Sequence, residues 1–149
     1  MSSSLSIKDQ RVISAIYEEA EKSPCRFKHG CCAAVNGKII AKGYNNYRQY
    51  SSDGIINDPC SCHAEMDVLR KCLQKRSAEK MKKVTFYVIR VSSSGLLRNS
   101  APCVDCSNNL QKYNIKRIIY STDDNTFVSV KQTEYSTDFI TRCRKERHN

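Results

Sequence analysis

The sequence predicts an α/β fold, in which a sheet has helices packed on its faces. Apolar positions at helical spacing alternate along the chain with short runs of small and β-branched residues, in the order α-β-β-α-β-α-β-β. Asn36-Gly37 separates two of the apolar runs, which is a strong signal of a hairpin. The turn Thr122–Asn125 is too short for a crossover helix, so the fifth strand should run antiparallel to the fourth.

The first helix is expected at residues 6–22, because Ser6 and Asp9 resemble a capping box and Ser23-Pro24 ends the helical pattern. Strands are expected at Cys31–Val35, Lys38–Tyr44, Val84–Val91, Lys116–Ser121 and Phe127–Gln132. Further helices are expected at His63–Arg76, from Pro102 onward and, as a short one, within Ser136–Arg147. Loops are expected at Asn45–Ser61 and Ser92–Ala101. Residues 1–149 are expected to form one domain.

The composition is ordinary for a globular protein, with 40% apolar and 27% charged residues. No apolar run approaches the ~20 residues that span a bilayer, and the first residues lack the pattern of a signal peptide. We therefore expect a cytoplasmic protein with no membrane contact. The formal net charge of +10 favours polyanions or a phosphorylated small substrate. Nucleic acid is a possible partner, although the basic residues are dispersed and form a run only in the tail Arg142–Arg147.

The nine cysteines do not predict a disulfide framework, because their number is odd and no export signal is recognised. Two of them have a better use as metal ligands, and most of the others are expected to be buried thiols. A second, structural zinc site that includes Cys25, Cys31 or Cys143 is the alternative.

Two short motifs predict a zinc-dependent reaction centre. The runs His63-Ala64-Glu65 and Pro102-Cys103-Val104-Asp105-Cys106 match the pattern H-x-E…P-C-x-x-C of zinc nucleobase deaminases. Cys103 and Cys106 lie three residues apart at a predicted helix start, so both sulfur atoms face one side. With His63 they give Zn²⁺ three ligands and leave a fourth position open, which is typical of a catalytic site.

Glu65 is predicted to be the catalytic carboxylate. Zinc lowers the pKa of a bound water toward ~7, so hydroxide becomes the nucleophile. Glu65 follows His63 by two residues, near enough to take the proton of that water, pass it to the ring nitrogen and later protonate the departing ammonia. The alternative is a structural zinc site whose fourth ligand comes from Cys60, Cys62 or Cys32.

On these motifs the chain resembles the cytidine/deoxycytidylate deaminase superfamily, from the first helix to the strand that ends near Ser121. The resemblance implies a cytidine-deaminase-like three-layer α-β-α sandwich with a mixed five-stranded sheet. Members usually assemble through helix faces beside the active site, so a homo-oligomer is expected. The antiparallel fifth strand departs from the usual deoxycytidylate deaminase pattern, which has a helix and a parallel strand there.

The resemblance also implies substrate contacts. The segment that contains Ala33 is similar to the strand that floors the base pocket, and Gly43-Tyr44-Asn45-Asn46 resembles the element whose Asn, here Asn45, contacts the sugar and often the base. The backbone N–H of Ala64 would bond the ring carbonyl. Ala101 stands before Pro102, where relatives often carry Glu, Ser or Thr.

Three functions remain open at this stage. The first is deamination of a cytosine nucleotide or nucleoside, such as dCMP, CMP, cytidine or deoxycytidine, with Arg26, Lys28 and Arg48 as phosphate partners. The second is deamination of single-stranded DNA or RNA, with bases stacked on the tyrosines of residues 44–50. Deamination of another heterocycle, such as guanine or a modified base, is a further alternative beside these two. The third is a non-catalytic module stabilised by zinc.

Overall fold

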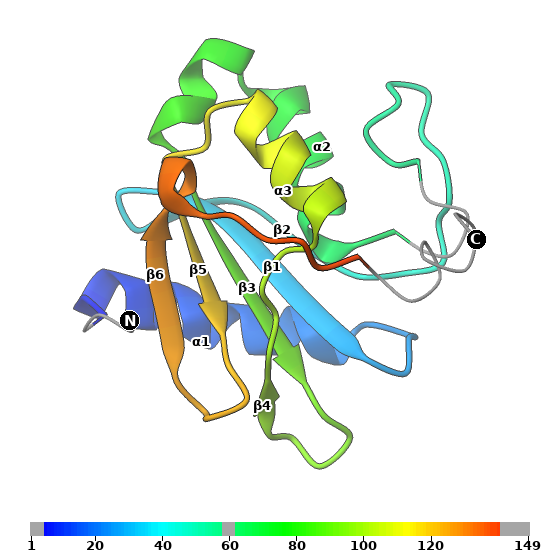
Figure 1. The fold of residues 1–149 in the computed structure, drawn as a ribbon, viewed down its shortest axis with the longest axis vertical. Helices are drawn as coiled ribbons and strands as arrows, with labels where there is room; N and C mark the ends of the chain where they lie inside the picture. Colours follow the sequence, from blue (N-terminus) through cyan, green and yellow to red (C-terminus); the bar gives the residue numbers. More distant parts are fainter. Residues whose placement is uncertain (1–4, 58–61, 141–149) are drawn as a thin grey trace.

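The computed structural model describes residues 5–57 and 62–140. Its helices are α1 (Ile7–Glu21), α2 (Ala64–Lys75) and α3 (Val104–Lys112), with short 3₁₀ segments at Ala78–Lys83 and Gln132–Glu134. Its strands are β1 (Lys28–Val35), β2 (Lys38–Tyr44), β3 (Thr85–Val91), β4 (Leu97–Arg98), β5 (Arg117–Ser121) and β6 (Phe127–Lys131) (Figure 1).

The strands form one mixed sheet in the order β2-β1-β3-β5-β6, with β4 paired to the end of β3. β1 is antiparallel to both of its neighbours, and β3 is parallel to β5. β6 is antiparallel to β5, which confirms the prediction from the short turn between them.

Several expectations need correction. The first strand begins at Lys28, three residues before the expected Cys31. The predicted loop at residues 92–101 contains the short strand β4, because two residues there pair with β3. The last strand ends one residue early, since Gln132 begins a 3₁₀ turn. The short helix expected within Ser136–Arg147 is not formed at residues 136–140, which have no regular secondary structure, and the rest of that range lies outside the described residues.

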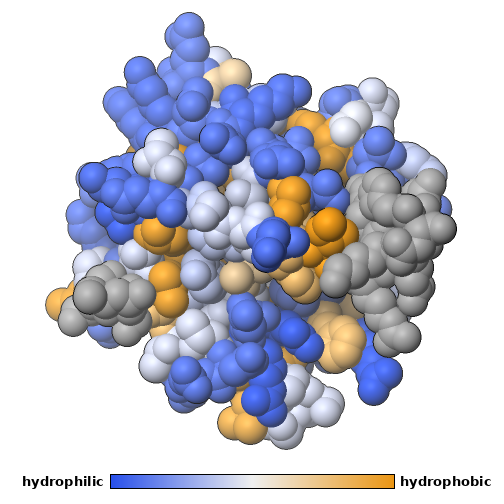
Figure 2. All heavy atoms as spheres, in the orientation of Figure 1, coloured by the Kyte–Doolittle hydropathy of each residue, from blue (hydrophilic) through white to orange (hydrophobic). Residues whose placement is uncertain are grey.

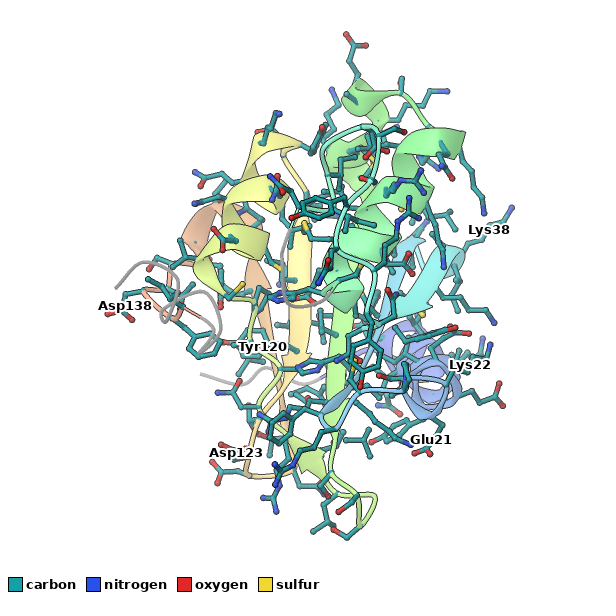
Figure 3. All side chains as sticks on the ribbon, turned by 90° about the vertical axis from the view of Figure 1, so that its right-hand side faces the viewer. Glu21, Lys22, Lys38, Tyr120, Asp123 and Asp138 are labelled. Carbon is teal, nitrogen blue, oxygen red and sulfur yellow. The ribbon has the colours of Figure 1, made fainter. Side chains whose placement is uncertain are left out.

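The helices lie on both faces of the sheet and make the expected three layers. α1 covers one face and α2 and α3 cover the other, so each face has its own buried apolar cluster. In Figure 3, Glu21 and Lys22 at the end of α1 lie on one side and Tyr120 and Asp138 on the other. Successive side chains of β1 face opposite sides of the sheet: Cys32 packs toward α1, whereas Cys31 and Ala33 pack toward α2 and α3.

Local chemistry explains how α1 and the first hairpin form. Ser6 Oγ accepts the N–H of Asp9, and the Asp9 carboxylate accepts the N–H of Ser6, which is the predicted capping box. α1 then packs so closely on β1 that a Cβ at Gly30 would lie 2.5 Å from the carbonyl oxygen of Ile16. Asn36-Gly37 adopts φ values of 54° and 84°, as a tight hairpin turn requires.

The segment after β6 crosses the start of α3 (Figure 1). The carbonyl oxygen of Phe139 accepts the N–H of Val104 at 2.8 Å, and Tyr135 Oη donates to the carbonyl oxygen of Pro102 at 2.5 Å. This face is mainly hydrophilic, with small apolar patches (Figure 2). Among the described helices, none combines the length and apolar character needed to cross a membrane.

Candidate metal centre and active site

His63, Cys103 and Cys106 converge where two helices begin. His63 is the N-cap of α2, and Cys103 is the N-cap of α3, with Cys106 in the first turn. His63 Nδ1 lies 3.1 Å from Cys106 Sγ and 3.6 Å from Cys103 Sγ, and the three ligand atoms all lie within 4.8 Å of one another. The structure thus brings together the three residues predicted as metal ligands.

α3 begins at Val104, two residues later than the expected start at Pro102. Pro102 precedes the N-cap and does not occupy the first helical position, so Cys103 has extended backbone angles. The spacing of the two cysteines still places both sulfur atoms on one side of the first turn. Cys103 is 4% exposed and Cys106 is 1% exposed, so both cysteine ligands are buried, whereas His63 is half-buried.

The pKa values of the two thiols are shifted in opposite directions. Hydrogen bonding from Cys106 lowers the pKa of Cys103 to about 4, and His63 acts in the same direction. The same hydrogen bond and burial raise the pKa of Cys106. One sulfur is therefore poised as a thiolate, which is the form that binds a metal ion.

The donor set fits Zn²⁺. Two sulfur atoms and one imidazole nitrogen suit zinc, whereas Mg²⁺ and Ca²⁺ prefer oxygen ligands. Within residues 5–57 and 62–140, no further His, Cys or carboxylate joins the cluster. Cys62 donates its S–H to the carbonyl oxygen of His63 at 3.4 Å, Cys32 packs on the α1 side of the sheet, and Cys60 lies outside the described residues.

The described residues contain no second cluster of three metal-ligating side chains. Cys31, which was a candidate for such a site, is buried in the apolar cluster below α2 and α3, and Cys25 is half-buried. Cys143, the third candidate, lies outside the described residues.

Glu65 is a buried carboxylate next to the cluster. It is the second residue of α2 and is 5% exposed. Burial raises the pKa of Glu65 to about 6, while His63 acts to lower it and Cys103 acts to raise it. In the described part of the chain no Lys or Arg forms an ion pair with Glu65. A buried carboxylate without such a partner is costly, which is typical of a functional group.

Two of the predicted substrate contacts, Ala33 and Ala64, lie with the metal cluster. Both are fully buried and belong to the apolar cluster that includes Cys103 and Cys106. Ala101 is half-buried, and its N–H donates to Asn99 Oδ1 at 2.8 Å. Their contacts with a base stay predictions.

The side chain of Asn45 is bonded within the protein. Its Oδ1 accepts from Ser23 Oγ at 2.6 Å and from the N–H of His29 at 2.9 Å, and its Nδ2 donates to the carbonyl oxygen of Phe27 at 2.7 Å. Asn45 therefore ties the turn before β1 to the end of β2. Asn46 exchanges two backbone hydrogen bonds with Cys62, which fixes the approach to His63.

The predicted phosphate partners are surface residues. Arg26 is exposed and its guanidinium lies 5.6 Å from the ring centre of Phe27. Arg48 is exposed, donates from Nε to the carbonyl oxygen of Tyr50 at 2.9 Å, and acts to lower the pKa of the nearby Cys62 thiol. Lys28 is paired with Glu21 at 3.8 Å.

Sequence reasoning missed two residues beside the centre. Tyr135 reaches the residue before Cys103 from the far end of the chain, and burial raises its pKa, with Glu65 and Cys103 adding to the effect. Burial lowers the pKa of His29 to about 4, and the positive charges of Arg90 and His63 add to the shift. The only sequence signal for His29 is its place in the segment that is similar to the strand flooring the base pocket.

A groove of about 430 Å³ runs along β5 and β6 beside Tyr120 and Tyr135. Neither the three clustered ligands nor Glu65 lines this groove. It is therefore separate from the metal centre.

Comparison with known proteins identifies related sequences and folds. A family model described as the zinc-binding region of cytidine and deoxycytidylate deaminases matches residues 6–122, a range that includes the whole cluster. No curated protein matches the chain.

Two solved proteins share the fold. The apo dCMP deaminase of cyanophage S-TIM5 is 24% identical over 78% of this chain and 83% of that chain, with a TM-score of 0.57. The same enzyme with dCMP and dUMP gives a TM-score of 0.54 at 20% identity over the same shares of the two chains. A cytidine deaminase from Burkholderia pseudomallei is 17% identical over 88% of this chain and 98% of that chain, with a TM-score of 0.64.

Proposed function

Because the chain belongs to the cytidine and deoxycytidylate deaminase family, we propose that it removes the amino group of a cytosine nucleotide or nucleoside by hydrolysis. The products are the uracil form and ammonia. The observation that carries this proposal is the cluster of His63, Cys103 and Cys106 with the buried carboxylate of Glu65 beside it. A structural zinc site needs no such carboxylate.

The chain's own residues would divide the work as follows. His63, Cys103 and Cys106 would hold the zinc ion, which when bound supplies the activation of water. Glu65 would carry one proton of that water to the ring nitrogen, and would then carry the second proton, from the hydroxyl added to the ring carbon, to the departing amino group. Burial supports this role, because a pKa of about 6 lets Glu65 both accept and donate a proton near neutral pH.

The first turn of α2 supports a contact with the base. The first N–H groups of a helix have no partner within the helix, so the N–H of Ala64 is suited to bond the ring carbonyl. Ala64 and Ala33 are small and lie in one apolar cluster, which favours close approach of a flat ring. The neighbouring cyanophage enzyme was solved with dCMP and dUMP, which is consistent with a pyrimidine nucleotide.

A polynucleotide substrate is the second candidate. Tyr47 and Tyr50 are 63% and 61% exposed on either side of Arg48, and the chain carries a formal net charge of +10. Exposed aromatic rings beside a cation can stack unpaired bases.

The test is ammonia release by the zinc-loaded protein from cytidine, deoxycytidine, CMP, dCMP and a cytosine-containing single-stranded oligonucleotide. Glu65→Ala serves as the inactive variant, and Asp67→Ala as the matched control. Asp67 lies one half-turn further along α2, where its carboxylate pairs with Lys71 at 3.0 Å. The proposal is supported if the protein deaminates a nucleoside or mononucleotide and only Glu65→Ala abolishes this turnover. Turnover of the oligonucleotide alone supports the second candidate, and zinc-loaded protein that is silent on all five overturns both.

A further inference from the structure

A row of basic side chains crosses the sheet on the same face as the metal centre. Arg90 is the register partner of His29 in β1 and of Arg98 in β4. Phe86 and Val88 of β3 pack toward α2 and α3, so alternation places Arg90 on that face too. Figure 1 shows β4 beside the end of β3 at the lower edge of the sheet.

Arg90 is held by an aromatic ring. Its guanidinium lies 4.4 Å from the ring centre of Phe27, and that of Arg26 lies 5.6 Å from the same ring. Phe27 is 53% exposed, yet its carbonyl oxygen is bonded to Asn45 Nδ2 at 2.7 Å. The stack therefore rests on the turn that Asn45 fixes, and it orients Arg90 without neutralising it.

The three guanidinium groups have no anionic partner in the described residues. None of Arg26, Arg90 and Arg98 forms an ion pair there. The carboxylate of Asp123, next to the end of β4, instead accepts the N–H of Asn99 at 2.9 Å. Like charges directly opposite each other on neighbouring strands are destabilising. The pair Arg90 and Arg98 is therefore expected to have a function that offsets this repulsion.

The row lies close to the reaction centre. Two strand residues span about 7 Å, so Arg90 lies about that far beyond Val88 along β3. The carbonyl oxygen of Val88 accepts from Ser100 Oγ at 2.8 Å, and Ser100 lies three residues before the ligand Cys103. On the other side, Arg90 lies opposite His29 in the register of β3 and β1, and the positive charges of Arg90 and His63 both act to lower the pKa of His29. A ligand that reaches from the metal centre along β3 would meet the guanidinium groups.

We propose that Arg26, Arg90 and Arg98 bind a phosphate group of the cytosine substrate. This assignment rests on the proposed deaminase function and deepens it, since it makes the substrate a phosphate-bearing one. Guanidinium groups suit this role because their planar donors match phosphate oxygens. The phosphate is either the monoester of a nucleotide or a diester of a single strand, and the experiment separates the two.

The first arm measures kcat/KM for dCMP and for deoxycytidine with the zinc-loaded protein. Arg90→Gln and Arg98→Gln are the test variants, and Arg11→Gln is the matched control, because Arg11 is exposed on α1 at the opposite face. We expect each test variant to lower the ratio of dCMP to deoxycytidine activity about tenfold or more, whereas Arg11→Gln keeps it within about twofold. Circular dichroism and the Tm confirm that each variant is folded.

The second arm measures binding in the Glu65→Ala background, so it does not depend on turnover. Calorimetry gives the affinity for dCMP and for a single-stranded oligonucleotide with one cytosine. Weaker dCMP binding on Arg90→Gln assigns the site to a phosphate monoester, and weaker oligonucleotide binding alone assigns it to a diester. Unchanged affinities in both Arg90→Gln and Arg98→Gln overturn the phosphate site. A protein that binds dCMP through these residues but deaminates no substrate overturns the proposed function alone.

Discussion

Replacing Cys106 with serine tests whether the cluster holds the metal. The side chain is 1% exposed and its sulfur lies 3.1 Å from His63 Nδ1, so no neighbouring group can easily take its place. A serine hydroxyl does not ionise as a thiol does and is a poor zinc ligand. Because the site forms only in the folded chain, metal binding adds to folding stability. Cys106→Ser should therefore lose zinc and the stability that zinc confers.

The size of the effect follows from mass action. Free zinc buffered at about 1,000 times the Kd stabilises the folded state by about 4.1 kcal/mol. In a chain of 149 residues, 1 kcal/mol changes the Tm by about 2–4 °C. Zinc should thus raise the Tm of the wild-type protein by about 8–16 °C and that of Cys106→Ser hardly at all.

Differential scanning calorimetry with and without buffered zinc measures this difference, and elemental analysis gives the metal content. Cys72→Ser is the matched control, because Cys72 is fully buried in α2 but is not one of the three clustered metal ligands. The Cys72→Ser protein should have a lower Tm than the wild type both with and without zinc, yet zinc should raise its Tm by the full wild-type amount. A Cys106→Ser protein that retains one zinc per chain and the wild-type rise in Tm would refute the ligand assignment.

Three further predictions concern the proton shuttle, pH and packing. Glu65→Ala should keep its zinc but lose turnover by about two to four orders of magnitude, as metal analysis and the ammonia assay would show; undiminished turnover would exclude Glu65. His29 has a folded pKa of about 4 against an ordinary 6.5, so only the unfolded chain takes up its proton between these values. The free energy of unfolding therefore keeps its full value above pH 6.5 and should fall by up to about 3 kcal/mol as the pH drops toward 4. Urea unfolding of the zinc-free protein measures this fall. His29→Gln should lack that part of the decline, and an unchanged pH profile would contradict the assignment. Gly30→Ala should destabilise the protein by about 1–3 kcal/mol, because its Cβ would lie 2.5 Å from Ile16 O and 2.8 Å from Ala20 N. Since both are backbone atoms that cannot easily move aside, an unchanged denaturation midpoint would show that α1 and β1 leave room for a methyl group at position 30.

Local signals explain why much of the fold was predictable. The capping box at Ser6 and the turn at Asn36-Gly37 act over a few residues, so the local sequence contains all that is needed to predict them. The antiparallel β6 follows from the length of one turn. The ligand triad was predictable because each motif places its side chains at a helix start.

Features that depend on distant pairing were not predictable. The basic row arises because the register puts Arg90 opposite Arg98, and nothing in either strand alone indicates it. Tyr135 reaches Pro102 only because the chain after β6 turns back over α3. Asn45 illustrates a different limit: its sequence context indicates a polar contact, but the choice between protein and ligand partners depends on the folded turn at Phe27.

The most direct test of hydrolytic deamination is product analysis in water enriched in heavy oxygen. Zinc-loaded wild-type protein and Glu65→Ala would be incubated with dCMP and with deoxycytidine, and the pyrimidine product analysed by mass spectrometry. We predict a uracil product that carries one heavy oxygen atom from water, formed by the wild-type protein and not by Glu65→Ala. A zinc-loaded wild-type protein that forms no uracil product, or one without the label, would contradict the account.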